Sequence, residues 1–343
     1  MRRPFFTSQR FKILLWGFLA VLGLSAVAVG SYSRYILGKI QYIDPTATSM
    51  LSQEALDHYT EAGDRPIPED TSLAPDEIIL PTQEALETEA NVINILLIGQ
   101  DRQSGEDRAR SDTILLCTLD TREKTLTMTS FLRDLYVAIP GYRSNRINAA
   151  YTAGGMALLD QTLETNFGIT VDGNIAVDFQ QFPQIIDLLG GVSLELRQDE
   201  AEHINTATGS QLSAGTHLLN GSQALAYTRI RKLDADGDFS RTNRQRKLLE
   251  ALLNSYRSTG TGQLLSLLET LLPMVTTDMT QEVLASVLTR CLPVLPQLEI
   301  RTQYIPEEGT YSYRKIRGMS VLVADMDKAR DLLKKTISPP RSE

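Results

Sequence analysis

Arginine side chains are concentrated in residues 227–246, a stretch that reads YTRIRKLDADGDFSRTNRQR and contains five of them. The chain of 343 residues has a formal net charge of −8 at pH 7, so this concentration is local. Guanidinium groups bind phosphate oxygens in pairs, and a pyrophosphate has enough oxygens for several of them. The stretch therefore indicates a site for a multiply charged anion. Surface ion pairs with Asp234, Asp236 and Asp238 explain the same spacing equally well.

The spacing of these side chains predicts two sets. Arg229 and Arg231 are two positions apart, so an extended segment would point both to one face. Arg241, Arg244 and Gln245 would project from one side of the helix that is predicted to follow. The two sets could converge on one anion.

Two carboxylates stand at predicted strand ends. Asp101 follows the apolar run VINILLIG, and Asp112 opens DTILLC. Residues at such positions in α/β proteins commonly line binding clefts. Two carboxylates beside a diphosphate suit Mg²⁺, with Mn²⁺ as the alternative. For Asp112 alone, a turn cap with Ser111 and Thr113 is the simpler interpretation.

Arg110 and the pair Arg133–Asp134 add charge at strand ends, although a buried ion pair would also explain the pair. The sequence contains no GxSxG motif and no Walker loop. Its three histidines share no metal-ligand spacing, which argues against zinc. Phosphoryl transfer, in which positioning and charge neutralisation carry most of the catalysis, is the chemistry that remains.

The N-terminal region predicts a membrane anchor. Residues 13–33 are uncharged and long enough to cross a bilayer as a helix. The stub 1–12 carries four basic and no acidic residues, which predicts a cytoplasmic N-terminus and an extracytoplasmic remainder. A cleaved signal peptide is the alternative, because SAVA offers small residues near the end of the run.

The remaining chain divides by composition. Residues 34–91 are acidic and contain several prolines, which predicts a linker unable to bury much apolar surface, with a short helix near 50–60. Strands and helices then interleave, which predicts one α/β domain over 92–338 and a tail at 339–343. Cys117 and Cys291 lie in apolar runs and are interpreted as core thiols, although one disulfide between them stays open. The expected helices cover 153–167, 181–189, 241–257, two stretches within 262–296, and 325–336.

An ordered series of motifs carries a family resemblance. The series is NILLIGQD, RSDTILL, TSFLRDLYVAIPG, RINAAYTAGG, VDFQQFPQIIDLLGGVSLEL and ALAYTRIRKLDADGDFSRTNRQR. It resembles the LytR-CpsA-Psr family of cell-wall enzymes, strongly over 92–255 and more weakly to about 338. The resemblance implies a central mixed β-sheet flanked by helices, after one N-terminal transmembrane helix.

The resemblance also implies an activity. Members transfer anionic glycopolymers, such as teichoic acid or capsular polysaccharide, from a polyprenyl-pyrophosphate carrier to the muramic acid 6-hydroxyl of peptidoglycan through a phosphodiester. Magnesium would be held by Asp101 and Asp112, and the prenyl chain by a tunnel between the sheet and helices such as 181–189 and 262–275. Arg133, Arg229 and Arg231 would then be catalytic. The attacking hydroxyl needs a base, for which Asp134 or a metal ligand is the candidate. The family's pyrophosphate-binding arginines match Arg133, Arg229, Arg231 and Arg241, with Gln245 as a polar partner. Arg110 and Arg244 are further candidates for binding the pyrophosphate, from their charge and position alone.

One departure from the family pattern concerns Tyr136, where some members carry a second arginine three residues after Arg133. Either Arg110 or Arg244 would then supply the missing charge, or the head of the substrate would differ. Three other functions compete with transfer: binding of lipid-linked pyrophosphates without turnover, transcription regulation, and hydrolysis of the lipid carrier. The carboxylates argue against a passive anion receptor, and the membrane helix and negative net charge argue against a nucleic-acid partner.

Overall fold

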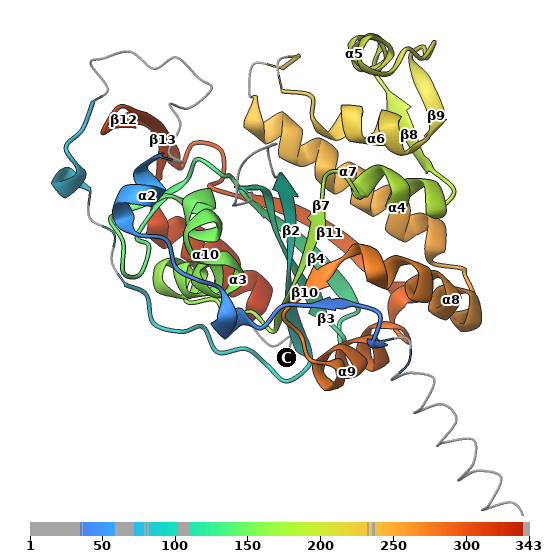
Figure 1. Ribbon diagram of the computed structural model, residues 1–343, viewed down its shortest axis with the longest axis horizontal. Helices are drawn as coiled ribbons and strands as arrows, with labels where there is room; N and C mark the ends of the chain where they lie inside the picture. Colours follow the sequence, from blue (N-terminus) through green and yellow to red (C-terminus); the bar gives the residue numbers. More distant parts are fainter. Residues whose placement is uncertain are drawn as a thin grey trace, which may run out of the picture.

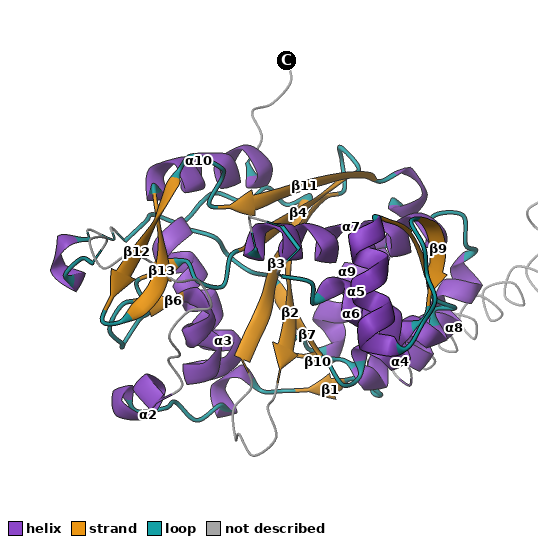
Figure 2. Ribbon diagram, turned by 90° about the horizontal axis from the view of Figure 1, so that it is seen from above, coloured by secondary structure: helices purple, strands orange, loops and turns teal. Residues whose placement is uncertain are grey.

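A seven-stranded mixed sheet forms the centre of the molecule (Figures 1 and 2). The computed structural model describes residues 35, 37–58, 72–78, 80, 82–101, 110–231, 233, 234 and 237–338. Strand order is β1-β10-β7-β2-β3-β4-β11, in which β2 runs parallel to β7 and antiparallel to β3. The bounds are β1 (Gln41–Tyr42), β2 (Val92–Asp101), β3 (Arg110–Asp120), β4 (Thr125–Phe131), β7 (Gly173–Asp178), β10 (Thr276–Thr277) and β11 (Glu299–Ile305). The expected mixed sheet within one α/β unit is confirmed.

Helices cover both faces of this sheet, and the strand β2 shows why. Leu96 and Ile98 pack with α3 (Ile147–Phe167) and α10 (Met326–Ile337) in the largest core cluster. Ile95, on the other face, packs with α9 (Gln281–Cys291). A strand buried on both faces reads as a nearly continuous apolar run, as VINILLIG does.

A helical lobe stands beside the sheet, on the right in Figure 1, and has its own apolar core. The close approach of α4 and α6 depends on Gly221, since a Cβ there would lie 2.0 Å from the Pro183 carbonyl oxygen. The paired strands β8 and β9 belong to this lobe and not to the central sheet. Its elements are α4 (Phe182–Leu188), β8 (Val192–Leu196), α5 (Gln198–Thr208), β9 (Gly215–Leu219), α6 (Gly221–Thr228), α7 (Asp238–Tyr256) and α8 (Thr261–Leu271).

Two small ladders lie on the side of the sheet opposite the helical lobe, on the left in Figure 2. They pair β5 (Tyr136–Val137) with β6 (Asn145–Arg146), and β12 (Tyr311–Ile316) with β13 (Met319–Ala324). The second ladder is tied to the segment after β4, because the Leu322 amide donates to the Asp134 carbonyl at 2.8 Å. The short elements that remain are α2 (Gln53–His58), η2 (Pro45–Ala47), η4 (Pro75–Glu77), η5 (Leu272–Met274) and η6 (Leu295–Gln297).

The predicted linker is more ordered than its composition suggested. Within its described part, Leu37, Leu56 and Leu86 are buried, and β1 joins the central sheet beside β10. The expectation that this segment buries little apolar surface is therefore wrong there, because isolated leucines anchor it where periodicity is absent. The short helix near 50–60 is confirmed as α2.

Most expected helices are confirmed, with α3 starting earlier at Ile147 than the predicted residue 153. The predicted membrane segment 13–33 lies outside the described residues. Within the residues that the structure describes, no helix is long and apolar enough to cross a membrane. Cys117 and Cys291 are both free, so they form no disulfide.

Candidate active site

A β-bulge positions the two aspartates that the sequence singled out. Gly99 pairs with Thr113 and Gln100 with Ser111, so Asp112 is the extra residue of β3. A bulge redirects a side chain and bends its strand, which lets Asp112 meet side chains from the helical lobe. Asp101 lies at the end of β2, opposite Arg110 in the ladder. Gly99 has to lack a side chain, because a Cβ would come within 2.9 Å of the Thr113 Cβ.

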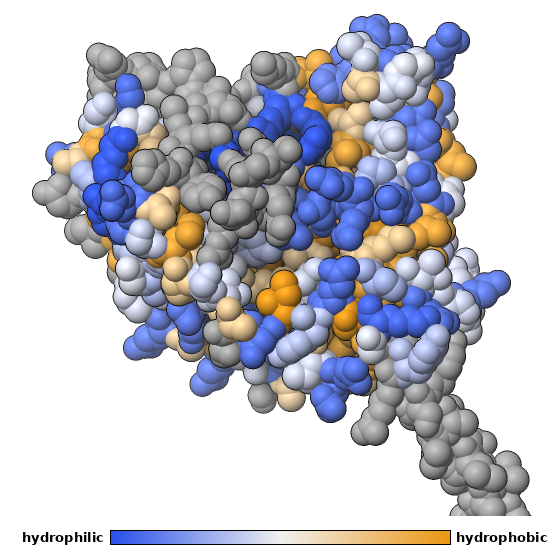
Figure 3. All heavy atoms as spheres, in the orientation of Figure 1, coloured by the Kyte–Doolittle hydropathy of each residue, from blue (hydrophilic) through white to orange (hydrophobic). Residues whose placement is uncertain are grey.

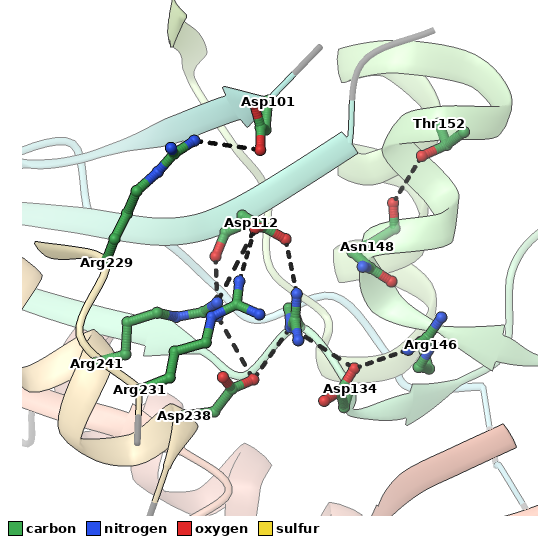
Figure 4. A network of polar contacts seen from close by, with 11 residues as sticks. Asp101, Asp112, Asp134, Arg146, Asn148, Thr152, Arg229, Arg231, Asp238 and Arg241 are labelled. Carbon is green, nitrogen blue, oxygen red and sulfur yellow. Dashed lines mark hydrogen bonds and ion pairs between the residues drawn. The ribbon is translucent and has the colours of Figure 1, made fainter. Parts of the chain in front are cut away.

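Three arginines surround Asp112, and we call Arg133, Arg231 and Arg241 the arginine cluster. Figure 4 shows Arg231 and Arg241 beside Asp112. Arg133 Nη1 donates to Asp112 Oδ1 at 3.0 Å, and Arg231 Nη2 donates to Oδ2 at 2.9 Å. Arg241 Nη2 donates to the Asp112 carbonyl oxygen at 3.2 Å. The site thus joins β3, the end of β4, the segment after α6 and the start of α7.

The second carboxylate in contact with the cluster is Asp238, at the first position of α7. Its Oδ2 accepts from Arg133 Nε at 3.1 Å and lies 3.5 Å from Arg241 Nη2. The sequence suggested Asp238 only as a surface ion-pair partner. Its actual contacts hold two members of the arginine cluster in place.

Arg241 is the most deeply buried of these groups, with 2% of its side chain exposed. Its Nε and Nη1 have no hydrogen-bond partner among the described residues. Burial lowers the pKa of Arg241 to about 10, despite the nearby Asp238. Buried donors without acceptors are costly, so an anion or an ordered water would have to complete the hydrogen bonds of Arg241.

Burial also acts on the two central aspartates, with opposite results. For Asp112, burial raises the pKa, but attraction by Arg133, Arg241 and Arg231 outweighs it and leaves the pKa below its ordinary value. For Asp134, burial prevails over the attraction of Arg133, and the pKa is raised. Asp134 is therefore the better proton acceptor of the two.

The backbone of the segment before α7, which carries Arg229 and Arg231, differs at Arg229 from the extended conformation that the sequence predicted. Thr228 ends α6, and Arg229 caps that helix in the αR region, so the segment is not extended there. Arg229 and Arg231 nevertheless both reach the strand ends. Arg229 Nη2 lies 3.3 Å from Asp101 Oδ2, and its guanidinium stacks over the Phe179 ring at 4.9 Å.

Arg244 does not join the cluster, contrary to the expected convergence of Arg241, Arg244 and Gln245. Its Nε donates to Glu200 Oε1 at 2.8 Å, and it also pairs with Asp234. The reason is its place on α7, where it faces α5 and not the sheet. Arg244 therefore cannot supply the charge missing at Tyr136.

Another arginine lies beside Tyr136, namely Arg146, which sequence reasoning missed as a separate site residue. Arg146 pairs directly with Tyr136 across the β5–β6 ladder. Its Nη1 donates to Asp134 Oδ1 at 3.1 Å. The motif RINAAY contained this arginine, but only the ladder shows that it faces the position of the missing one.

An apolar cavity of about 120 Å³ lies between the central sheet and helices α4, α6 and α7. Its lining includes side chains from each of these elements, among them Leu97, Leu115, Val177, Phe182, Gln245 and Leu249. Thr113 and Thr228, which follow Asp112 and precede Arg229 in the chain, also line it, so the cavity adjoins the charged site. The predicted tunnel along 181–189 fits this position, whereas α8 contributes no lining residue and α7 takes its place.

Asp101 and Asp112 are two carboxylates that could bind magnesium, although they would supply only part of its ligands. No group of three or more potential metal ligands exists among the described residues. Mg²⁺ needs few protein ligands when phosphate oxygens and water complete its shell. Asp101 and Asp112, on adjacent strand ends, would hold it beside the arginine cluster.

Fold and site together define a class: an α/β protein whose arginines stand at the edge of an apolar cavity. A family model described as LytR_cpsA_psr family matches residues 53–338. The chain belongs to this family, and the resemblance noted in the sequence is confirmed.

Several relatives are similar to this chain over part of their length. Regulatory protein MsrR of Staphylococcus aureus is 39% identical over 162 residues, 47% of this chain and 48% of MsrR, so the chain spans about half of that relative. The polyisoprenyl-teichoic acid–peptidoglycan teichoic acid transferase TagU of Oceanobacillus iheyensis is 36% identical over 211 residues, 59% of this chain and 63% of TagU. The TagU of Bacillus licheniformis is 29% identical over 71% of this chain and 70% of that protein.

Solved structures show the same fold. TagT bound to LIIa-WTA has a TM-score of 0.60 and 27% identity, covering 72% of this chain and 91% of TagT. Bacillus subtilis TagV has a TM-score of 0.60 and 26% identity, covering 74% of this chain and all of TagV. TagT with bound octaprenyl pyrophosphate lipid has a TM-score of 0.57 and 24% identity, covering 75% and 96%, and shares the fold.

Proposed function

We propose that this protein is a phosphotransferase of the cell envelope. It would join an anionic glycopolymer, of teichoic acid or capsule type, from a polyprenyl-pyrophosphate carrier to peptidoglycan through a phosphodiester. The names of the TagU relatives and the wall polymer bound by TagT support this reaction class. Residues 13–33 would anchor the chain in the membrane with the domain outside the cell.

One observation carries the proposal: the arginine cluster adjoins the apolar cavity. A lipid-linked pyrophosphate has a compact, multiply charged head directly attached to an apolar chain. The unpartnered nitrogens of Arg241 fit the head, and the cavity beside Thr113 and Thr228 fits the start of the chain. A soluble phosphate ligand would have no use for such a cavity.

The chain's own residues would act as follows. The arginine cluster binds the pyrophosphate and stabilises the negative charge that develops on the leaving polyprenyl phosphate. Asp238 holds Arg133 and Arg241 in position. An acceptor hydroxyl attacks the phosphorus next to the glycan, the bond to polyprenyl phosphate breaks, and Asp134 takes the hydroxyl proton. Magnesium bound to Asp101 and Asp112 would add positive charge against the phosphate oxygens.

Transfer is tested directly with the full-length chain in nanodiscs, a synthetic polyprenyl-pyrophosphate glycan and peptidoglycan oligosaccharides. Mass spectrometry follows the glycan, with magnesium or with a chelator. Joined product that requires magnesium and is lost in Arg231→Ala is the expected result. Tight lipid binding without joining, over several glycans and acceptors, would establish the competing function of a non-catalytic binder.

The metal assignment has its own test. Asp112→Ala should lose transfer even at saturating magnesium, since a metal ligand is gone. Unchanged transfer would show that Asp112 serves only the arginines. For the membrane anchor, a C-terminal reporter that is active only in the cytoplasm should stay inactive, and a signal from it would contradict the orientation.

A further inference from the structure

A second cavity, which we call the polar pocket, lies beside α7 on the side away from the arginine cluster. Its volume is about 240 Å³. Ser240, Asn243, Arg244 and Lys247 line it from α7, at the spacing of one helix face. Arg241 is on another face of the same helix. In Figure 3, hydrophilic side chains gather where α7 begins and over α5 at the upper right. The transfer reaction described above leaves this pocket without a role.

The floor of the polar pocket is a closed network of charges. Arg244 Nε lies 2.8 Å from Glu200 Oε1, and Arg197 Nη1 lies 2.8 Å from Asp234 Oδ1. Arg244 also pairs with Asp234. The side chains of Arg244 and Glu200 are only 4% and 8% exposed. Because two arginines face two carboxylates, the floor is balanced in charge and has no excess attraction for a polyanion.

The rim of the pocket offers different chemistry. Glu195 of β8 and Lys247 of α7 carry opposite charges, and Ser240 and Asn243 add a hydroxyl and an amide. The structure gives these four side chains no hydrogen bond or ion pair with any residue that it describes. A fitting ligand therefore has hydrogen-bonding groups and both signs of charge. Pyrophosphate and prenyl chains both fail that requirement.

We propose that the polar pocket binds the peptide stem of the acceptor peptidoglycan. This inference rests on the proposed function, which makes peptidoglycan the acceptor. A short peptide has backbone amides for Ser240 and Asn243, a carboxylate for Lys247 and a free amine for Glu195. Ser240 directly precedes Arg241, so the polar pocket and the arginine cluster lie on two faces of the same helix. A sugar attached to a stem held in the pocket would have to span about 10 Å, the width of a helix, to reach the cluster.

Equilibrium binding tests the pocket without transfer. Isothermal titration of the full-length chain in detergent uses a soluble peptidoglycan disaccharide with its peptide, and the same disaccharide without it. Lys247→Glu and Glu195→Lys each turn an attraction into a repulsion, so the peptide-bearing ligand should bind about tenfold more weakly to either variant. Lys334→Glu, an exposed lysine on α10, is the matched control and should bind like the wild type.

Three outcomes would overturn the proposal: equal binding by both pocket variants, equal binding of the disaccharide with and without peptide, or no binding of either ligand. Pyrophosphate binding by the same variants separates this proposal from the proposed function. Pocket variants should retain it, and Arg231→Ala should lose it. If Arg231→Ala bound pyrophosphate like the wild type, the proposed function would fail while the peptide result stood by itself.

Discussion

Asp112 holds the arginine cluster together when no anion is bound, so Asp112→Asn should destabilise the protein measurably. The carboxylate lies 3.0 Å from Arg133, 2.9 Å from Arg231 and 4.0 Å from Arg241. Removing one partner of a buried ion pair costs about 3–5 kcal/mol. Because the Asp112 side chain keeps 16% exposure, we expect the low end, about 3 kcal/mol. For a domain of this size the melting temperature should fall by roughly 6–12 °C.

The assay is thermal unfolding of the purified full-length chain, without magnesium, over a pyrophosphate titration. Pyrophosphate replaces the missing carboxylate in the variant, whereas in the wild type it competes with Asp112 for the arginines. The variant should therefore gain more stability than the wild type at the same pyrophosphate concentration. At a hundred times its Kd, a ligand raises the free energy of unfolding by about 2.7 kcal/mol. Asp327→Asn, an exposed position on α10, is the control and should melt with the wild type. A variant as stable as the wild type, or equal gains from pyrophosphate in both, would refute the reasoning.

Three further predictions follow from burial. Arg241→Met should weaken pyrophosphate binding by about 2–5 kcal/mol without lowering the melting temperature, because it removes a buried cation of which Nε and Nη1 lack hydrogen-bond partners. A large loss of stability would contradict this. Asp160 is buried beside Asn174, and burial raises its pKa from 3.8 to about 7. Its protonated form therefore stabilises the fold, and the free energy of unfolding should fall between about pH 4 and 7 and level off above that range. Chemical unfolding should show a weaker decline for Asp160→Asn, and an unchanged pH profile would sink the assignment. Leu249→Trp should fill the apolar cavity, so calorimetry should show weaker binding of a long prenyl pyrophosphate but unchanged binding of pyrophosphate. Leu253→Trp, outside the cavity lining, is the control and should bind both ligands like the wild type.

Local patterns predicted the parts of the fold whose residues interact with close neighbours in sequence. Apolar runs identified β2 and β3, and side-chain spacing identified α7 to within a few residues. The closing helix α10 was also predicted to within a few residues, whereas the two helices within 262–296 were predicted without separate bounds. Strand pairing depends on distant segments, so the sequence did not show that β8 and β13 lie outside the central sheet. The alternation in YTRIR predicted an extended segment, but α6 continues through Thr228, because Tyr227 and Thr228 are buried as part of that helix.

In the candidate active site, too, local patterns predicted some residues, and contacts between distant segments decided the rest. Asp101 and Asp112 were identified because both stand at strand ends, although only the register reveals the bulge that aims Asp112. The positions of Arg241 and Arg244 on α7 predicted one shared face. Glu200, which attracts Arg244 away, lies on α5 some 44 residues earlier, and no local pattern contains that contact. Arg146 was missed because its partner Asp134 lies across a turn and a two-residue ladder.

The most direct test of the central claim follows the phosphorus atom itself. A polyprenyl-pyrophosphate glycan labelled at the phosphate next to the sugar is incubated with the full-length chain, magnesium and peptidoglycan oligosaccharide. If the arginine cluster holds a donor for transfer, the label appears in a phosphodiester with the acceptor, and unlabelled polyprenyl monophosphate is released. Label recovered in glycan phosphate would show hydrolysis, and label retained in intact lipid would show a binder, and either result would contradict the proposed transfer.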